Sequence, residues 1–169
     1  FIAHPKTKYK IQNHLKTPLE MLIITEEAPE SSSKEVIVRN TKDLSFDDFN
    51  PPLHWCHRSK TIFHYERDNL YKLHSISLVY IDPKRLPEPH PHFPGHDEVW
   101  HALEGKTIMA FRDDMMIQQT PGTSILIPDS GEIYHTSINP YNKTAKFFFF
   151  MYSIGLANPI LITGSRGII

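Results

Sequence analysis

The stretch HPHFPGHDEVWHALEG, residues 90–105, joins a proline-rich run to a short segment with strand-like alternation. His90 and His92 are two positions apart, so in extended backbone their side chains project from one face, about 7 Å apart. Two imidazoles placed in this way can converge on one metal ion. The prolines around the pair restrict the backbone and lack an amide donor, which indicates a loop or a strand end.

The residues that follow divide between the two faces of a strand. Glu98, Trp100 and Ala102 share one face, while Val99, His101 and Leu103 share the other. Glu98 can therefore approach an ion held by the His90 and His92 pair from the neighbouring strand. His101 points away from such a site, so it is a poor candidate for a ligand.

The rest of the second half of the chain consists of short segments rich in β-branched and aromatic residues. Turn signals such as Glu104-Gly105-Lys106 and Pro121-Gly122 separate them. Short strands at close spacing, with almost no helical periodicity, predict an all-β antiparallel sandwich or barrel. The expected strands cover residues 73–81, 98–103, 107–112, 115–119, 123–128, 132–139 and 145–154.

Composition excludes several classes of function. The 169 residues include 18 basic and 19 acidic side chains, so no nucleic-acid surface is implied. The apolar runs are shorter than a bilayer span, and we expect no membrane partner. Cys56 is the single cysteine, which fits a reducing compartment. We expect a cytoplasmic protein. The sequence begins with Phe1 rather than Met, so the alternative of a leader that has been removed stays open.

The spacing of these residues resembles the two conserved motifs of the cupin superfamily. The first motif is matched by His90, His92, Glu98 and Gly105, and the second by Gly122, Pro128, His135 and Asn139. The resemblance implies a jelly-roll (double-stranded β-helix) cupin barrel over residues 59–169. Residues 1–58 are then an irregular N-terminal extension that packs on the barrel, with short edge strands near 19–25 and 35–39.

The resemblance also implies a metal centre. Carried over by position, the ligands are His90, His92, Glu98 and His135, with His96 as a reserve ligand that could replace His92. Such a donor set suits one divalent transition metal, Mn, Fe, Ni, Co or Zn, and four protein ligands on a six-coordinate ion leave two positions open.

Three functions are compatible with such a centre. Residues 98–106 and 121–128 are similar to the cupin-type phosphoglucose isomerases of archaea. This implies an isomerase or lyase that acts on a small, polar, sugar-like substrate by metal-assisted proton transfer, with Glu98 as the catalytic carboxylate. The alternatives are an Fe(II)-dependent cupin dioxygenase and a non-catalytic ligand-binding cupin.

The surroundings of the site and the assembly state are predicted from aromatic and charged positions. Residues 147–152 place aromatic side chains on both faces of a strand, so the face outside the barrel should meet the N-terminal extension or a second subunit. We therefore expect a homodimer. The candidates for lining a substrate pocket are Tyr80, Trp100, Arg112, Tyr134 and Tyr152.

Overall fold

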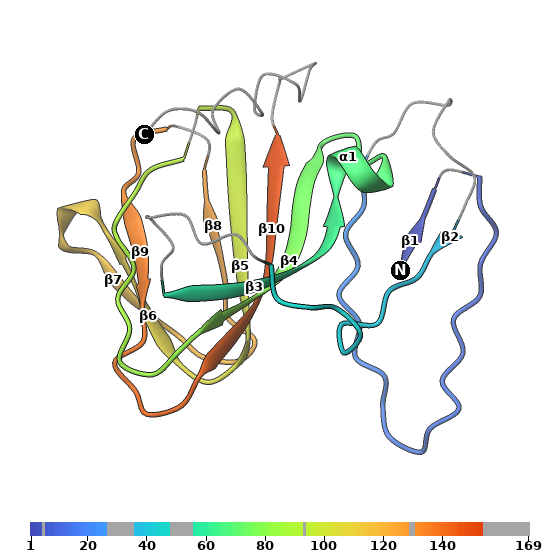
Figure 1. Cartoon of the computed structure of the whole chain (residues 1–169), viewed down its shortest axis with the longest axis horizontal. Helices are drawn as coiled ribbons and strands as arrows, with labels where there is room; N and C mark the ends of the chain where they lie inside the picture. Colours follow the sequence, from blue (N-terminus) through green and yellow to red (C-terminus); the bar gives the residue numbers. More distant parts are fainter. Residues whose placement is uncertain (5, 27–35, 48–55, 93, 129–130, 154–169) are drawn as a thin grey trace.

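The computed structural model describes residues 1–4, 6–26, 36–47, 56–92, 94–128 and 131–153, and its main feature is a pair of antiparallel sheets that enclose a barrel (Figure 1). The larger, five-stranded sheet has the order β3-β4-β10-β5-β8, and the smaller, three-stranded sheet has the order β7-β6-β9. The strands are β3 (His57–His64), β4 (Leu73–Ile81), β5 (His96–Glu104), β6 (Thr107–Phe111), β7 (Met116–Gln119), β8 (Ser124–Ile127), β9 (His135–Ile138) and β10 (Ala145–Ser153). The prediction of an all-β jelly roll is confirmed.

Strand register decides which side chains enter the barrel. On β10, Phe147 and Phe149 are paired with Val79 and Ser77 of β4 on one side and with Ala102 and Trp100 of β5 on the other. Paired residues project to the same face of a sheet. The inner face is therefore apolar along most of its length, and its fully buried members include Ile81, Met109, Ile127 and Phe147.

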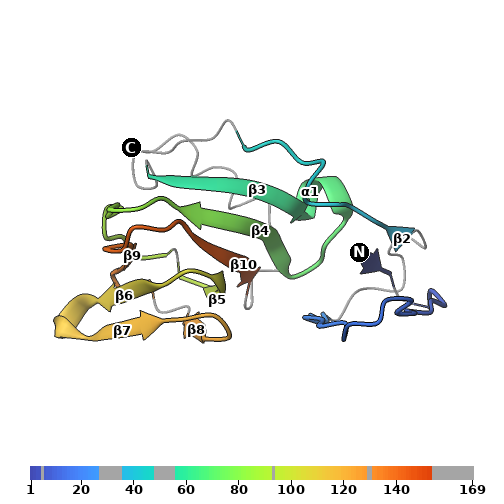
Figure 2. The same cartoon turned by 90° about the horizontal axis from the view of Figure 1, so that it is seen from below.

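The outer face of the large sheet carries a second apolar cluster, which the N-terminal extension covers in part. Ile62, Leu73, Ile76 and Leu78 are buried there, and the partly buried side chains packed against this outer cluster come from β10 and from the extension: Phe148, Phe150, Tyr152, Ile2, Ile24, Ile37 and Leu44. Figure 2 shows the extension beside the end of this sheet at which the chain turns from β3 to β4. The outer aromatic residues of β10 and the N-terminal segment therefore pack against the same apolar cluster.

Polar side chains fasten the extension to the barrel. The carboxylate of Glu26 accepts hydrogen bonds from the backbone amides of Tyr71, Lys72 and Leu73 at 2.6 to 2.9 Å. The Asp47 carboxylate accepts from the hydroxyl of Ser59 at 2.6 Å and from the hydroxyl and amide of Thr61. Each carboxylate joins the extension to strands that the chain reaches only later.

Asp68 completes this attachment at the short helix α1 (Tyr65–Asp68). It is 1% exposed and accepts hydrogen bonds from Arg39, from Arg67 and from the backbone amide of His64. Burial alone would raise the pKa of Asp68, but these donors and charges hold it below the usual range. Arg39 also lies over the Phe63 ring, 5.1 Å from its centroid, so it is held on several sides.

The strands of the N-terminal extension differ from the sequence prediction. Residues 19–25 form no strand, and the strands in the described part of the extension are β1 (Ile2–Ala3) and β2 (Val36–Ile37), which pair with each other. A segment forms a strand only where it pairs with a neighbouring strand, and residues 19–25 do not pair with the outer edge of β3.

The helices of the described part of the chain lack the length and apolar character of a membrane span.

Candidate metal centre

The loop between β4 and β5 carries the first two histidines of the site, and backbone pairing fixes it against β9. The amide of His90 donates to the carbonyl of His135 at 3.2 Å, and the amide of His135 donates to the carbonyl of His90 at 3.1 Å. The hydroxyl of Thr136 also donates to the carbonyl of Pro87 at 2.8 Å. Residues that are 45 positions apart in the sequence are thereby placed next to each other.

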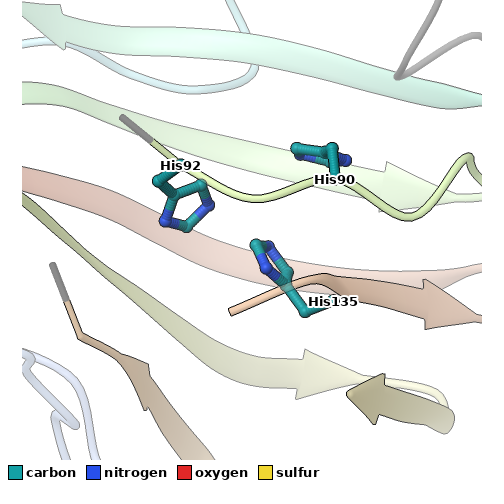
Figure 3. Close-up of side chains that lie close together, drawn as sticks. All are labelled: His90, His92 and His135. Carbon is teal, nitrogen blue, oxygen red and sulfur yellow. The ribbon is translucent and has the colours of Figure 1, made fainter. Parts of the chain in front are cut away.

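Three imidazoles gather at this junction (Figure 3). Ligand nitrogens of His90, His92 and His135 all lie within 4.8 Å of one another. The ring centroids are 4.5 Å apart for His92 and His135, and 5.1 Å apart for His90 and His135. The two sequence motifs therefore meet in space.

Glu98 reaches the same place from β5. Its Oε1 lies 2.7 Å from Nε2 of His92, and its Oε2 lies 3.6 Å from Nε2 of His135. Two ligand atoms at right angles on one ion, each bound at about 2.1 Å, are about 3 Å apart. The carboxylate is therefore at a distance from both imidazoles that suits a shared ion.

Backbone carbonyls orient two of the imidazoles. Nδ1 of His90 donates to the carbonyl of Glu88 at 2.9 Å, and Nδ1 of His135 donates to the carbonyl of Ile133 at 3.2 Å. A proton fixed on Nδ1 leaves Nε2 with its lone pair, which is the form that binds a metal. Burial lowers the pKa of His90, an effect that also favours its neutral, ligand form.

The remaining nitrogens provide a test of whether a metal fits. Nε2 of His92 and Nε2 of His135 are buried without hydrogen-bond geometry to any described residue, despite the nearby carboxylate. A buried polar atom without a partner costs about 1–3 kcal/mol, so native proteins rarely keep one without a ligand, ion or water to satisfy it. Two such lone pairs beside one carboxylate fit a divalent transition metal.

The charge of Glu98 supports the same assignment. Burial alone would raise its pKa, but the contacts with His135 and His92 hold the pKa well below the usual range. Its Oε2 also accepts a hydrogen bond from Nε1 of Trp100 at 2.8 Å. Glu98 is thus an ionised and oriented carboxylate, suited to bind a cation.

The two other histidines near the motif lie outside this cluster. His96 is 3% exposed on the same face of β5 as Glu98, and neither of its ring nitrogens has a hydrogen-bond partner among the described residues. Its ring lies 6.3 Å from that of His74 between centroids. His101 lies on the opposite face, where its Nδ1 contacts the hydroxyl of Ser124 at 2.8 Å.

The five pocket candidates divide into two groups. Trp100 faces the barrel interior, and Arg112 and Tyr134 line a hollow of about 520 Å³ beside β6 and β9. Tyr80 and Tyr152 belong to the outer cluster instead, which corrects the prediction that they line the pocket. Tyr80 packs edge-on against Phe46 and Tyr152 pairs with Leu73, so both are on the face away from Glu98.

Sequence reasoning missed the groups that hold the ligands in place. Trp100 was assigned to the pocket, but its hydrogen bond to Glu98 was not predicted. The two-residue spacing on one strand face could have indicated it, because such side chains are neighbours. The carbonyls of Glu88 and Ile133 carry no signal in the sequence.

Comparison with known proteins supports the fold. No protein-family model matches the chain, and no curated protein matches it by sequence. Solved structures do match, among them the polyketide cyclase RemF from Streptomyces resistomycificus, with a TM-score of 0.60, 18% identity, and coverage of 70% of this chain and 80% of that one. Others are described as cupin barrels, and the chain has the cupin fold.

Other cupin structures match over a similar extent. A predicted oxalate decarboxylase from Thermotoga maritima has a TM-score of 0.58 and 12% identity, with 70% of this chain and 100% of that chain covered. A sugar phosphate isomerase of the cupin superfamily from Silicibacter pomeroyi has a TM-score of 0.55 and 14% identity, with 67% of this chain and 73% of that chain covered. These proteins are described by different activities, so the shared cupin fold does not select a reaction.

Proposed function

We propose that this protein is a metal-dependent enzyme of the isomerase or lyase type, which acts by metal-assisted proton transfer on a small substrate that presents oxygen atoms to the metal. Sugars are the class that the sequence resemblance suggests. One observation carries the proposal: the ligand nitrogens of His90, His92 and His135 lie within 4.8 Å of one another, and Nε2 of His92 and of His135 lie 2.7 Å and 3.6 Å from the oxygens of an ionised Glu98.

The chain's own residues have defined parts in this proposal. His90, His92, Glu98 and His135 hold one divalent metal, which when bound polarises a carbonyl or hydroxyl oxygen of the substrate. Trp100 fixes Oε2 of Glu98. Oε1 is then the carboxylate atom oriented to accept a substrate proton, and the apolar lining of the barrel excludes bulk water from it.

The proposal is tested by isotope exchange in heavy water. The purified protein is reconstituted separately with Mn²⁺, Fe²⁺, Ni²⁺, Co²⁺ and Zn²⁺ and incubated without oxygen with a panel of sugars, sugar phosphates and hydroxy acids. We expect deuterium to enter one substrate at the carbon next to a carbonyl, with at least one of the metals. The Glu98→Gln variant should reduce exchange by about 100-fold, as for loss of a general base.

The same samples distinguish the alternatives. Oxygen uptake that requires Fe²⁺, without anaerobic exchange, would identify a dioxygenase and contradict the proposal. Stoichiometric metal binding with neither exchange nor oxygen uptake across the panel would favour a non-catalytic barrel. The His101→Ala variant serves as the control, because it removes an imidazole from the outer face of β5 and should leave exchange unchanged.

A further inference from the structure

A lateral slot opens into the barrel between the two sheets, next to the candidate metal centre. β7 is an edge strand of the small sheet and β8 is an edge strand of the large one. Between them lies a hollow of about 580 Å³, a size within the range of small-molecule sites. Its inner lining is apolar and consists of side chains that pack against the inner core: Phe111, Ile117, Ile125 and Ile133.

Two residues that line the slot contact a metal-ligand candidate. The ring of Phe111 lies 6.4 Å from that of His135 between centroids, and the carbonyl of Ile133 accepts the hydrogen bond from Nδ1 of His135. The slot and the candidate metal centre therefore share Phe111 and Ile133.

The outer rim of the slot carries one cation, Arg112, among its described residues. Arg112 is exposed, and it also lines the adjoining hollow with Tyr134. Its backbone amide donates to the carbonyl of Tyr134, but its guanidinium has no carboxylate partner among the described residues. Glu132, the acidic residue of the lining, is exposed at the same rim.

We propose that this slot is a binding site for a small amphipathic carboxylic acid, with the apolar body between β7 and β8 and the carboxylate on Arg112. A guanidinium matches a carboxylate with two parallel hydrogen bonds, which favours an acid over a neutral polar group. The inference goes beyond the proposed function, because it adds an acid-binding site beside the candidate metal centre and leaves the substrate class of that centre unchanged.

Calorimetric titration of the metal-loaded protein tests the inference with matched probes. Naphthylacetate, naphthylethanol and naphthylethylamine share one apolar body and differ in charge, and sorbitol represents a sugar-like ligand. We expect naphthylacetate to bind about tenfold more tightly than the alcohol, the amine and sorbitol, as for one charge-assisted contact.

Variants assign the two ends of the slot. Arg112→Gln should remove the tenfold preference for the acid and leave binding of the alcohol unchanged. Ile117→Trp fills the slot and should weaken the acid and the alcohol alike, about tenfold. Lys106→Gln, an exposed cation at the turn before β6 and thus at its opposite end, should have no effect.

Several outcomes would overturn the inference: equal affinity for the acid and the alcohol, no binding of either at millimolar concentration, or a preference that survives Arg112→Gln. Unaltered binding in Ile117→Trp would also contradict it. Metal content is measured on each sample. Full metal content without acid binding refutes the slot alone, whereas acid binding without metal uptake refutes the proposed function alone.

Discussion

Two polar clusters of this barrel differ in how their buried groups are satisfied. Around Asp68, outside the large sheet, the carboxylate meets Arg39, Arg67 and a backbone amide. Inside the barrel, Nε2 of His92 and of His135 make no hydrogen bond of good geometry to a described residue, although both lie near the Glu98 carboxylate. The outer cluster is satisfied by protein groups, whereas the geometry of the inner cluster fits a bound ion.

Removing Asp68 should produce the largest effect and should change stability only. Asp68→Ala leaves Arg39 and Arg67 without their acceptor, and breaking a buried ion pair costs about 3 kcal/mol. Urea unfolding of the metal-free protein measures the loss. Asp82→Ala is the control, because Asp82 pairs with Arg58 at an exposed position and should cost less than about 1 kcal/mol. Lost metal binding with unchanged stability in Asp68→Ala would erase the distinction between the clusters.

Removing the indole hydrogen bond to Glu98 should weaken metal binding and have a smaller effect on stability. Trp100→Phe keeps an aromatic ring in the core but frees Oε2 of Glu98. Loss of a group that orients a ligand lowers metal affinity about 10- to 100-fold. Competition with a chelator of known affinity measures it. Phe149→Leu alters packing against Trp100 without touching the hydrogen bond, so equal loss of affinity in both variants would argue for packing instead.

A glycine beside the histidine-bearing loop should have an intermediate effect. Gly131 has φ of +70°, and a Cβ there would lie 2.7 Å from Cγ of Pro94, two residues after His92. Gly131→Ala should cost about 1–2 kcal/mol and also weaken metal binding. Gly122→Ala is the matched control, because φ is +88° but nothing lies within 4 Å of its Cβ. It should lose stability alone, and a weaker metal affinity in Gly122→Ala would refute the steric explanation.

The smallest expected effect is the change in the free energy of unfolding at acid pH. The pKa of Asp68 is lowered in the folded protein, so its contribution is present above the ordinary value of 3.8 and is lost as the pH falls through the folded value. The difference in free energy of unfolding between the wild type and Asp68→Ala should therefore shrink below about pH 4. Urea titrations at a series of pH values measure it. A difference that grows as the pH falls would have the wrong sign.

Local patterns predicted much of the fold and of the candidate site. Alternation along residues 98–103 placed Glu98 and Trp100 inside and His101 outside, as the register of β5 shows. The resemblance of two motifs to those of the cupin superfamily implied that His90, His92 and His135 lie together, and their ligand nitrogens are within 4.8 Å of one another.

The features that the sequence did not predict depend on contacts between residues that lie far apart in the chain. Tyr80 and Tyr152 were candidates for lining the pocket, but the face that each occupies depends on the register between β4 and β10 and on a bulge between Met151 and Tyr152. The lateral slot depends on which strands end up at the two sheet edges, and no local pattern encodes that.

Metal stoichiometry tests the central claim most directly. The protein is stripped with a chelator, titrated with Co²⁺, and followed by absorption and elemental analysis. We predict one ion per chain in the wild type and in His101→Ala, and about 100-fold weaker binding or none in His135→Ala. Equal binding of Co²⁺ by the wild type and His135→Ala, or no binding by the wild type, would contradict the account.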